Sequence, residues 1–235
     1  MKNDRALVLL PGLDGTGDLF ESFVSALPLN LKPKVVRYPA DRFLTYEELF
    51  PFVIDAIPGA QPFVLLAESF STPLAVRLAA TNPSNLTALI ICAGFIKNPM
   101  PGWLWWMKAL VRPSVFRVPP PRIVLEYFLI GAHAPRSLRD ALRRALRLVA
   151  PAVIASRVQA VMGCDAEEDL VRVQVPTLYL QAEQDRLVRK ACFEEIKQLK
   201  RDTILAPIPA PHLVLQREPQ MAADLIERFL EDLPD

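Results

Sequence analysis

The feature that most constrains the fold is a series of six short apolar runs separated by segments with helical spacing. The runs are rich in Val, Ile and Leu without strict alternation, which is typical of strands buried on both faces of a parallel sheet. We expect strands at Ala6–Leu10, Lys34–Tyr38, Phe63–Leu66, Ala88–Cys92, Thr177–Gln181 and Thr203–Ile208. The alternation predicts an α/β fold with a mostly parallel six-stranded sheet and helices on both faces.

Helices are expected between the strands, because apolar residues recur there at the three- and four-residue spacing of an amphipathic helix. These segments are Asp18–Leu27, Tyr46–Ile57, Pro73–Ala80 and a last helix that begins at Pro219. A proline suits the first turn of a helix. The last helix should bury one side, formed by Leu225, Ile226, Phe229 and Leu230.

One long stretch, residues 95–176, breaks this alternation. It shows no evident strand, its patterns are mainly helical, and it contains several prolines, including the run 119–121. We interpret it as a helical cap inserted between the fourth and fifth strands and packed over one edge of the sheet. The core would then consist of residues 1–94 and 177–235.

The composition narrows the class of protein. With 235 residues and 51% hydrophobic residues, the chain can bury one large core and is not expected to be disordered. A net charge of +1 gives no reason to expect nucleic-acid binding. Three scattered cysteines are too few for a disulfide framework or a metal site. The first apolar run is too short for a signal-peptide core or a membrane span, so a cytoplasmic location is the default expectation.

A candidate nucleophile follows the third strand, in the sequence Ala67-Glu68-Ser69-Phe70-Ser71. A sharp strand-to-helix turn that exposes a nucleophilic serine needs small residues two positions before and after it, usually glycines. Here alanine and serine fill those positions, so the motif is degenerate. The helix that follows would favour developing negative charge near Ser69.

A serine hydroxyl is a weak nucleophile and needs a base, and the chain has only two histidines. His212 follows the sixth strand, whereas His133 lies inside the insertion, so His212 is the expected base. Asp185 follows the fifth strand and would orient it, with Glu183 in the same loop as the alternative. The order Ser, Asp, His along the chain is the one found in α/β-hydrolases.

An oxyanion hole requires backbone N–H groups that point at the tetrahedral intermediate. One should be the amide of Phe70, next after the nucleophile. The other should come from the loop after the first strand, where three glycines in residues 12–17 allow a close approach of the backbone. We assign this second donor to Leu13. Such a mechanism requires neither a metal nor an organic cofactor.

These motifs together resemble the α/β-hydrolase superfamily over nearly the entire chain. The loop Leu10-Pro11-Gly12-Leu13 is similar to the superfamily's His-Gly oxyanion loop, with proline in place of histidine. The sequences around Asp185 and His212 are similar to its acid and histidine loops. The resemblance implies a minimal α/β-hydrolase fold in which the cap selects the substrate. A looser similarity connects residues 11–17 with the esterase/acyltransferase domain of plant phytyl ester synthases.

The combined pattern predicts a serine hydrolase of the carboxylesterase type that cleaves acyl esters or thioesters through an acyl-enzyme. Two alternatives remain open. An acyltransferase would use the same site with a lipophilic alcohol in place of water. A non-catalytic module with this fold would bind an acidic carrier protein or a lipid.

The expected cap is strongly basic, which bears on its partners. Residues 101–160 contain ten basic and two acidic residues. The arginines that share one helical face are Arg136, Arg139, Arg143 and Arg147. All three tryptophans lie within residues 103–106, and we expect Trp103 and Trp106 to bind the acyl part of a small-molecule ester. The basic surface is either simply solvated or binds an anionic acyl substrate, an acidic acyl-carrier protein or an anionic lipid surface.

Overall fold

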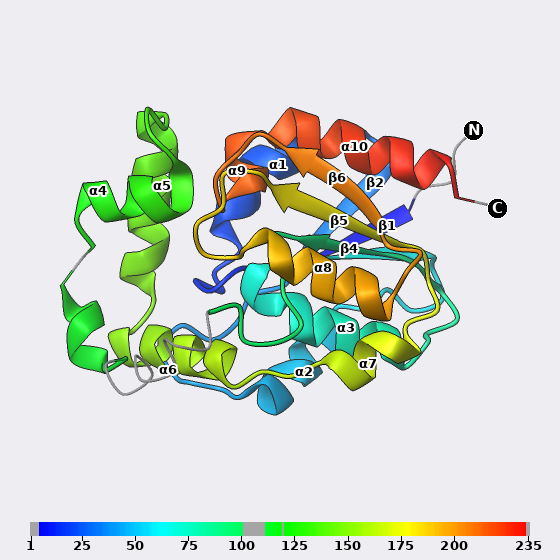
Figure 1. The fold of residues 1–235 in the computed structure, drawn as a ribbon, viewed down its shortest axis with the longest axis horizontal. Coiled ribbons are helices and arrows are strands. Elements are labelled where there is room, and N and C mark those ends of the chain that lie inside the picture. The colour runs from blue at the N-terminus through cyan, green and yellow to red at the C-terminus, as the bar shows by residue number, and fades with distance from the viewer. Residues whose placement is uncertain (1–4, 101–110, 119, 234–235) are drawn as a thin grey trace.

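The computed structural model describes residues 5–100, 111–118 and 120–233, with a six-stranded sheet at its centre (Figure 1). The strand order is β2-β1-β3-β4-β5-β6, and every neighbouring pair is parallel. The strands are β1 (Arg5–Leu10), β2 (Leu31–Val35), β3 (Phe63–Glu68), β4 (Leu86–Cys92), β5 (Thr177–Ala182) and β6 (Ile204–Ile208). The predicted α/β fold and its parallel six-stranded sheet are confirmed, and five strands lie within two residues of their expected bounds.

The second strand is the exception, because it begins three residues before the expected run. Its central residues Lys32, Pro33 and Lys34 are exposed, as suits an edge strand, where lysine and proline discourage pairing with another chain. The apolar residues Val36 and Tyr38 lie beyond its end. Their amides donate to carbonyls of β1 and of the loop after it, and both side chains are buried. The apolar run therefore corresponds to the buried segment after β2, which bonds to β1 and its loop, and not to the strand itself.

Each face of the sheet supports its own apolar core. On β1, Leu7 and Leu9 belong to one core, whereas Val8 and Leu10 belong to the other. All four side chains are fully buried. Because alternate residues of a strand point to opposite faces, burial on both sides requires a continuous apolar run.

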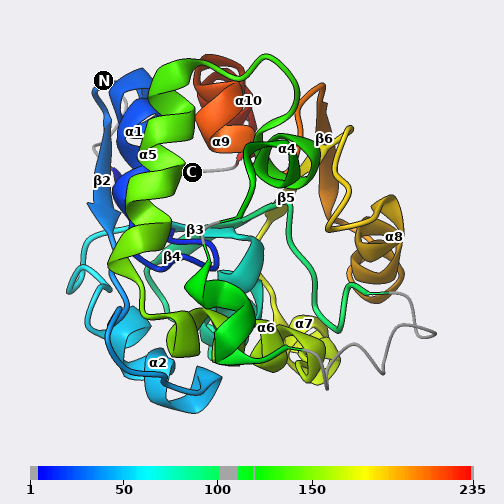
Figure 2. The ribbon, with the colours of Figure 1, turned by 90° about the vertical axis from the view of Figure 1, so that its left-hand side faces the viewer.

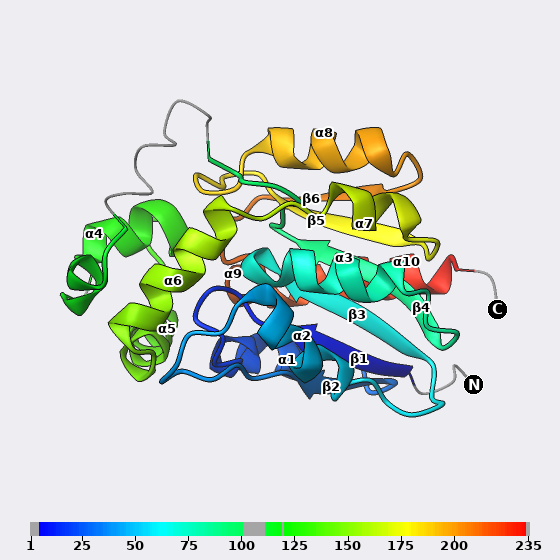
Figure 3. The same cartoon turned by 90° about the horizontal axis from the view of Figure 1, so that it is seen from below.

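Helices cover both faces (Figures 1 and 3). One face is covered by α1 (Glu21–Ala26), α9 (Val214–Arg217) and α10 (Pro219–Glu231). The other is covered by α2 (Tyr46–Ile54), α3 (Thr72–Ala80), α7 (Glu167–Arg172) and α8 (Lys190–Leu199). Two expected helices are shorter than their patterns. The first is split into a 3-10 turn, η1 (Asp18–Phe20), and α1, and the second ends before Pro58, which disfavours a helical conformation in the preceding residue.

In the described part of the chain between β4 and β5, the regular elements are helices and helical turns, apart from an isolated bridge between Lys97 and Asp165. Its elements are the turn η4 (Pro113–Arg117), α4 (Arg122–Leu125), the π-helical turn η5 (Glu126–Ile130), α5 (Arg136–Leu148), α6 (Pro151–Met162) and α7. Figure 2 shows α4, α5 and α6 in front of the sheet, on the side toward which the strand arrows of Figure 1 point. We call the described part of this layer, residues 111–162, the cap. By contrast, α7 packs beside α3.

The cap helix α5 is amphipathic. It buries Leu138 and Leu142 in a small core that includes Leu19 and Leu213 of the main domain. Its opposite side is rich in arginine and more exposed. Among the described residues, no single helix is long and apolar enough to cross a membrane. The helices α5 and α6 reach that length and apolar composition only when taken together, and they are bent by 97° relative to each other.

Candidate active site

The carboxyl ends of β1 and β3 lie side by side, with Leu10 opposite Ala67 in the parallel register. From β1 the chain continues to β2 on one side, and from β3 it continues to β4 on the other. A crevice opens where neighbouring parallel strands send their connections in opposite directions, and ligands bind there in α/β proteins. The loops that follow these two strands contain Leu13 and Ser69.

The structure brings together the three side chains that the sequence predicted as a triad. The Nε2 atom of His212 lies 3.0 Å from Ser69 Oγ, and its Nδ1 atom lies 2.7 Å from Asp185 Oδ2. Facing an ionised aspartate, Nδ1 carries the ring proton, which leaves Nε2 to accept the proton of the serine hydroxyl. Ser69 is 9% exposed and His212 5% exposed, so the hydrogen bonds are largely shielded from water.

The electrostatic environment of His212 favours its protonated form. Burial lowers its pKa, but attraction to Asp185, the hydrogen bond to that carboxylate and attraction to Glu68 outweigh this effect. The net result is a pKa raised from its ordinary 6.5. A histidine with a raised pKa takes up the serine proton more readily, which is what a general base requires.

The serine turn keeps its strained geometry without the usual glycines. Ser69 has a φ of 47°, in the left-handed region that non-glycine residues seldom adopt. Ala67 and Ser71 on either side are fully buried. The Ser71 hydroxyl donates to the Pro11 carbonyl and therefore accepts the proton of the Tyr38 hydroxyl, 2.9 Å away. The Ser71 hydroxyl thus connects the serine turn to the loop after β1.

Asp185, and not Glu183, is the acid that contacts the histidine. One carboxylate oxygen of Asp185 accepts the amides of Leu187 at 2.8 Å and Val188 at 3.0 Å, which leaves the other oxygen for His212. The side chain is only 2% exposed. Glu183 is exposed. The second histidine, in the η5–α5 connection, is also exposed and has no contact with the triad among the described hydrogen bonds.

The expected oxyanion loop is tightly folded. The Gly15 amide donates to the Gly12 carbonyl at 3.0 Å, and Asp14 accepts the amide of Thr16 at 2.9 Å. Because the C=O and N–H of a trans peptide point in opposite directions, the Leu13 amide points away from the Gly15 amide. Within the described part of the chain, neither the Leu13 amide nor the Phe70 amide donates to another backbone group. The absence of such a bond outside the helices and strands is what a donor to an oxyanion requires.

Glu68, for which the sequence predicted no role, directly precedes Ser69 and is 1% exposed. Burial and repulsion from Asp14 raise its pKa to about 7, although Gln216, His212 and the Gly12 amide oppose the shift. Gln216 Nε2 donates to one carboxyl oxygen at 3.3 Å. The other oxygen is buried without a partner among the described residues. The sequence does contain a signal for this residue, because a glutamate at the end of an otherwise apolar strand is unusual.

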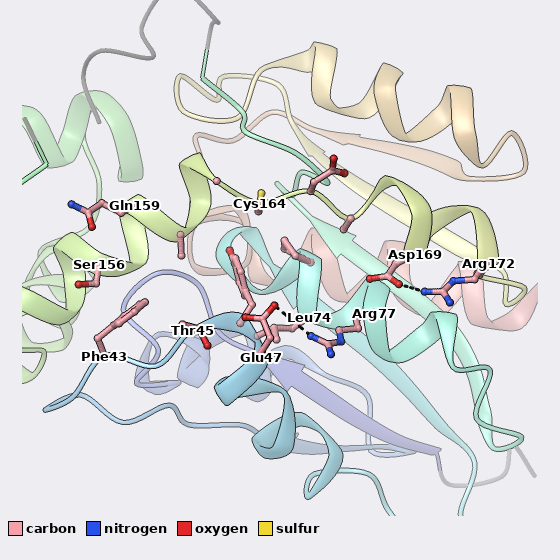
Figure 4. Close-up of a pocket in the computed structure, with 16 residues that line it drawn as sticks. Phe43, Thr45, Glu47, Leu74, Arg77, Ser156, Gln159, Cys164, Asp169 and Arg172 are labelled. Carbon is pink, nitrogen blue, oxygen red and sulfur yellow. Dashed lines mark hydrogen bonds and ion pairs between the residues drawn. The ribbon is translucent and has the colours of Figure 1, made fainter. Parts of the chain in front are cut away.

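The chain also has a groove beside the cap, with a volume of about 830 Å³, between α2, α3, α6 and α7 (Figure 4). Its lining includes the charged pairs Arg172–Asp169 and Arg77–Glu47. No triad residue is among its described lining residues, so we do not assign the acyl substrate to it. The expected acyl contacts Trp103 and Trp106 lie outside the described residues. No cluster of three metal-ligating side chains occurs in the described ranges.

Comparisons with known proteins agree with the architecture. No protein-family model and no curated protein sequence matches the chain. Solved structures do match, at low sequence identity. They include a lipase-esterase related protein from Clostridium acetobutylicum (TM-score 0.77, 14% identity, 97% of this chain and 95% of that chain). An enol-lactonase from Burkholderia xenovorans is also similar (TM-score 0.78, 17% identity, 98% of this chain and 92% of that chain). So is a bromoperoxidase from Bacillus anthracis (TM-score 0.80, 15% identity, 98% of this chain and 93% of that chain).

The chain therefore has an α/β-hydrolase fold, as predicted from the sequence motifs.

Proposed function

We propose that this chain is a serine hydrolase of the carboxylesterase type, which cleaves acyl esters or thioesters through an acyl-enzyme. The observation that carries the proposal is the continuous hydrogen-bonded series from Asp185 through His212 to Ser69 at the carboxyl edge of the sheet. The names of an esterase-related protein and a lactonase among the similar structures support the same chemistry.

In the proposed first step, Ser69 Oγ attacks the acyl carbonyl carbon while His212 Nε2 takes the hydroxyl proton. The carbonyl oxygen becomes an oxyanion that the Leu13 and Phe70 amides stabilise. When the tetrahedral intermediate collapses, the bond to the leaving group breaks, and His212 gives its proton to the departing alcohol or thiol. Asp185 keeps the imidazole in the required orientation throughout.

The second step releases the acyl group. Water attacks the acyl-enzyme carbonyl while His212 takes one of its protons, and the same two amides stabilise the second oxyanion. Collapse breaks the bond to Ser69 Oγ, which regains its proton from His212. The products are a carboxylic acid and the unchanged enzyme.

The test is the hydrolysis of p-nitrophenyl esters of short and medium acyl length. We expect Ser69→Ala to lower kcat by about 10⁴–10⁶-fold, because the nucleophile is removed while the fold remains. Ser137→Ala, at an exposed serine of the cap, is the matched control and should retain wild-type activity. Equal hydrolysis by Ser69→Ala and the wild type would refute the proposal.

We further propose that the outer face of the cap binds an anionic lipid surface. Among the described residues, six of the sixteen exposed large apolar side chains lie within residues 115–128. Val118 is 70% exposed and Ile123 is 74% exposed. Exposed arginines 117, 122, 136 and 144 accompany them. Apolar side chains flanked by arginine favour the interface of an anionic membrane, whose negative lipids attract the basic residues.

Sedimentation with vesicles tests this partner. The protein should bind phosphatidylglycerol-containing vesicles, less at high salt, and should bind pure phosphatidylcholine weakly. Val118→Ser combined with Ile123→Ser should reduce binding. Leu29→Ser, at a site 91% exposed before β2, should not. Equal binding by the double variant, or capture of an acidic carrier protein without vesicle binding, would contradict the proposal.

A further inference from the structure

Arg157 is the largest fully buried side chain of the described residues, although it belongs to the cap helix α6. It is 2% exposed. Burial lowers its pKa, while attraction to Asp14 and Tyr38 opposes the shift. Burying a guanidinium is costly unless its N–H groups are satisfied, so its partners indicate what the residue does.

The guanidinium binds backbone carbonyls from two distant segments. Its Nη1 atom donates to the Leu13 carbonyl at 2.9 Å and to the Asp14 carbonyl at 2.7 Å. Its Nη2 atom donates to the Pro39 carbonyl at 2.8 Å. The rings of Tyr38 and Phe70 lie 5.9 and 5.8 Å from its central carbon, within cation–π distance. Arg157 thus connects the cap to the loop after β1 and to the segment after β2.

These bonds fix the peptide planes on both sides of Leu13. The Gly15 amide holds the Gly12 carbonyl of the preceding plane. Arg157 holds the Leu13 carbonyl of the following plane. The Leu13 N–H lies in the first of these planes. Arg157 supports that plane as well, because it also holds the Asp14 carbonyl, which shares a peptide plane with the Gly15 N–H. Arg157 therefore constrains the direction of the Leu13 N–H, the donor expected in the oxyanion hole.

The loop also makes room for the guanidinium. A Cβ atom at Gly15 would lie 2.5 Å from Arg157 Nη1, and the φ of Gly15 is +68°. Space and backbone conformation therefore both require glycine at this position. The glycine at position 15 is accordingly matched to a residue that lies 142 positions further along the chain.

We infer that Arg157 is a positioning residue that orients the Leu13 amide toward the oxyanion, so that hydrolysis depends on the docking of α6 onto the core. The inference rests on the proposed function. A planar guanidinium has five N–H donors in a fixed geometry, whereas a lysine ammonium is a compact charge on a flexible stem. A lysine at position 157 should therefore keep the positive charge, but it should not hold the three carbonyls in the same arrangement.

The experiment compares Arg157→Met and Arg157→Lys with the wild type, using p-nitrophenyl butyrate. Misplacing one oxyanion donor costs about 10²-fold in kcat, so we expect that loss in Arg157→Met with little change in KM. Arg157→Lys should recover only part of it. Arg201→Met, at an exposed arginine in the turn between α8 and β6, is the matched control and should remain active. Thermal unfolding confirms that each variant is folded at the assay temperature.

Amide hydrogen exchange provides a readout that does not depend on activity. Exchange in the segment 12–17 should accelerate in Arg157→Met, and exchange in β3 should stay slow. Guanidinium added at millimolar concentration should restore part of the activity of Arg157→Ala, whereas urea should not. A folded Arg157→Met variant with wild-type kcat, or with unchanged exchange in the loop, would overturn the inference. A wild-type enzyme without esterase activity would instead refute the proposed function.

Discussion

The carboxyl edge of the sheet and the cap above it differ in which side chains they bury and which they expose. At the sheet edge, Ser69, His212 and Asp185 are shielded from water, and each has a defined partner. The outer cap instead exposes aliphatic side chains such as Ile123 among arginines. The side chains of the proposed chemistry therefore belong to the core, whereas the exposed apolar side chains and arginines of the cap underlie the proposed lipid binding. Arg157 is the cap residue that crosses from one region to the other.

After the loss of Ser69, the largest effect should come from the acid of the proposed triad. Asp185→Ala should lower kcat/KM by about 10⁴-fold, because the imidazole loses the group that fixes its tautomer and orientation. Glu183→Ala, two positions away in the same loop, should stay close to wild type because that side chain is exposed. Steady-state kinetics on one p-nitrophenyl ester measures both. A larger loss in Glu183→Ala would reverse the assignment.

The buried carboxyl of Glu68 should make stability depend on pH. Its folded-state pKa, about 7, exceeds the ordinary 4.5, so the folded protein holds a proton that the unfolded chain releases between those values. This contribution is fully present below about pH 4.5 and is lost as the pH rises through about 7. Relative to Glu68→Gln, the wild type should lose about 3 kcal/mol of unfolding free energy across this range. Urea unfolding at several pH values measures it, and parallel curves would contradict the expectation.

The pH dependence of catalysis tests whether Glu68 acts on His212. His212 must be neutral to accept the serine proton, so kcat/KM should rise with pH through an apparent pKa above 6.5. Glu68 contributes to raising the pKa of His212. Glu68→Gln should therefore move this limb of the profile to lower pH. A shift to higher pH, or none, would show that the carboxyl does not act on the imidazole.

The smallest effect should come from the outer cap. Val118→Ser and Ile123→Ser together should leave kcat/KM for a soluble p-nitrophenyl ester unchanged, because both side chains are mostly exposed. Exposed positions usually change stability by no more than about 0.5 kcal/mol when substituted. The same assay as for Asp185→Ala measures the effect. A large loss on the soluble ester would remove the distinction between the two regions.

The sequence predicted the parts of the molecule that depend on local pattern. Strands buried on both faces must be continuously apolar, and five of the six could be located for that reason. The proximity of Ser69, Asp185 and His212 could be predicted because each follows such a strand, in the expected order. The edge strand β2 was misplaced because an exposed edge does not require apolar residues.

Other parts depend on contacts that no local pattern contains. The choice of Asp185 over Glu183 required the direction of each side chain in the loop. The role of Arg157 required the position of a cap helix relative to a loop 142–144 residues away in sequence. The raised pKa of Glu68 depends on burial beside Asp14, which comes from a different strand end.

The most direct test of the central claim is the reaction of the folded protein with a fluorophosphonate, followed by intact-mass measurement and peptide mapping. We expect a single adduct on Ser69, absent after heat denaturation and absent in Ser69→Ala. An unlabelled wild type, or an adduct on a different serine, would contradict the claim that Ser69 is an activated nucleophile.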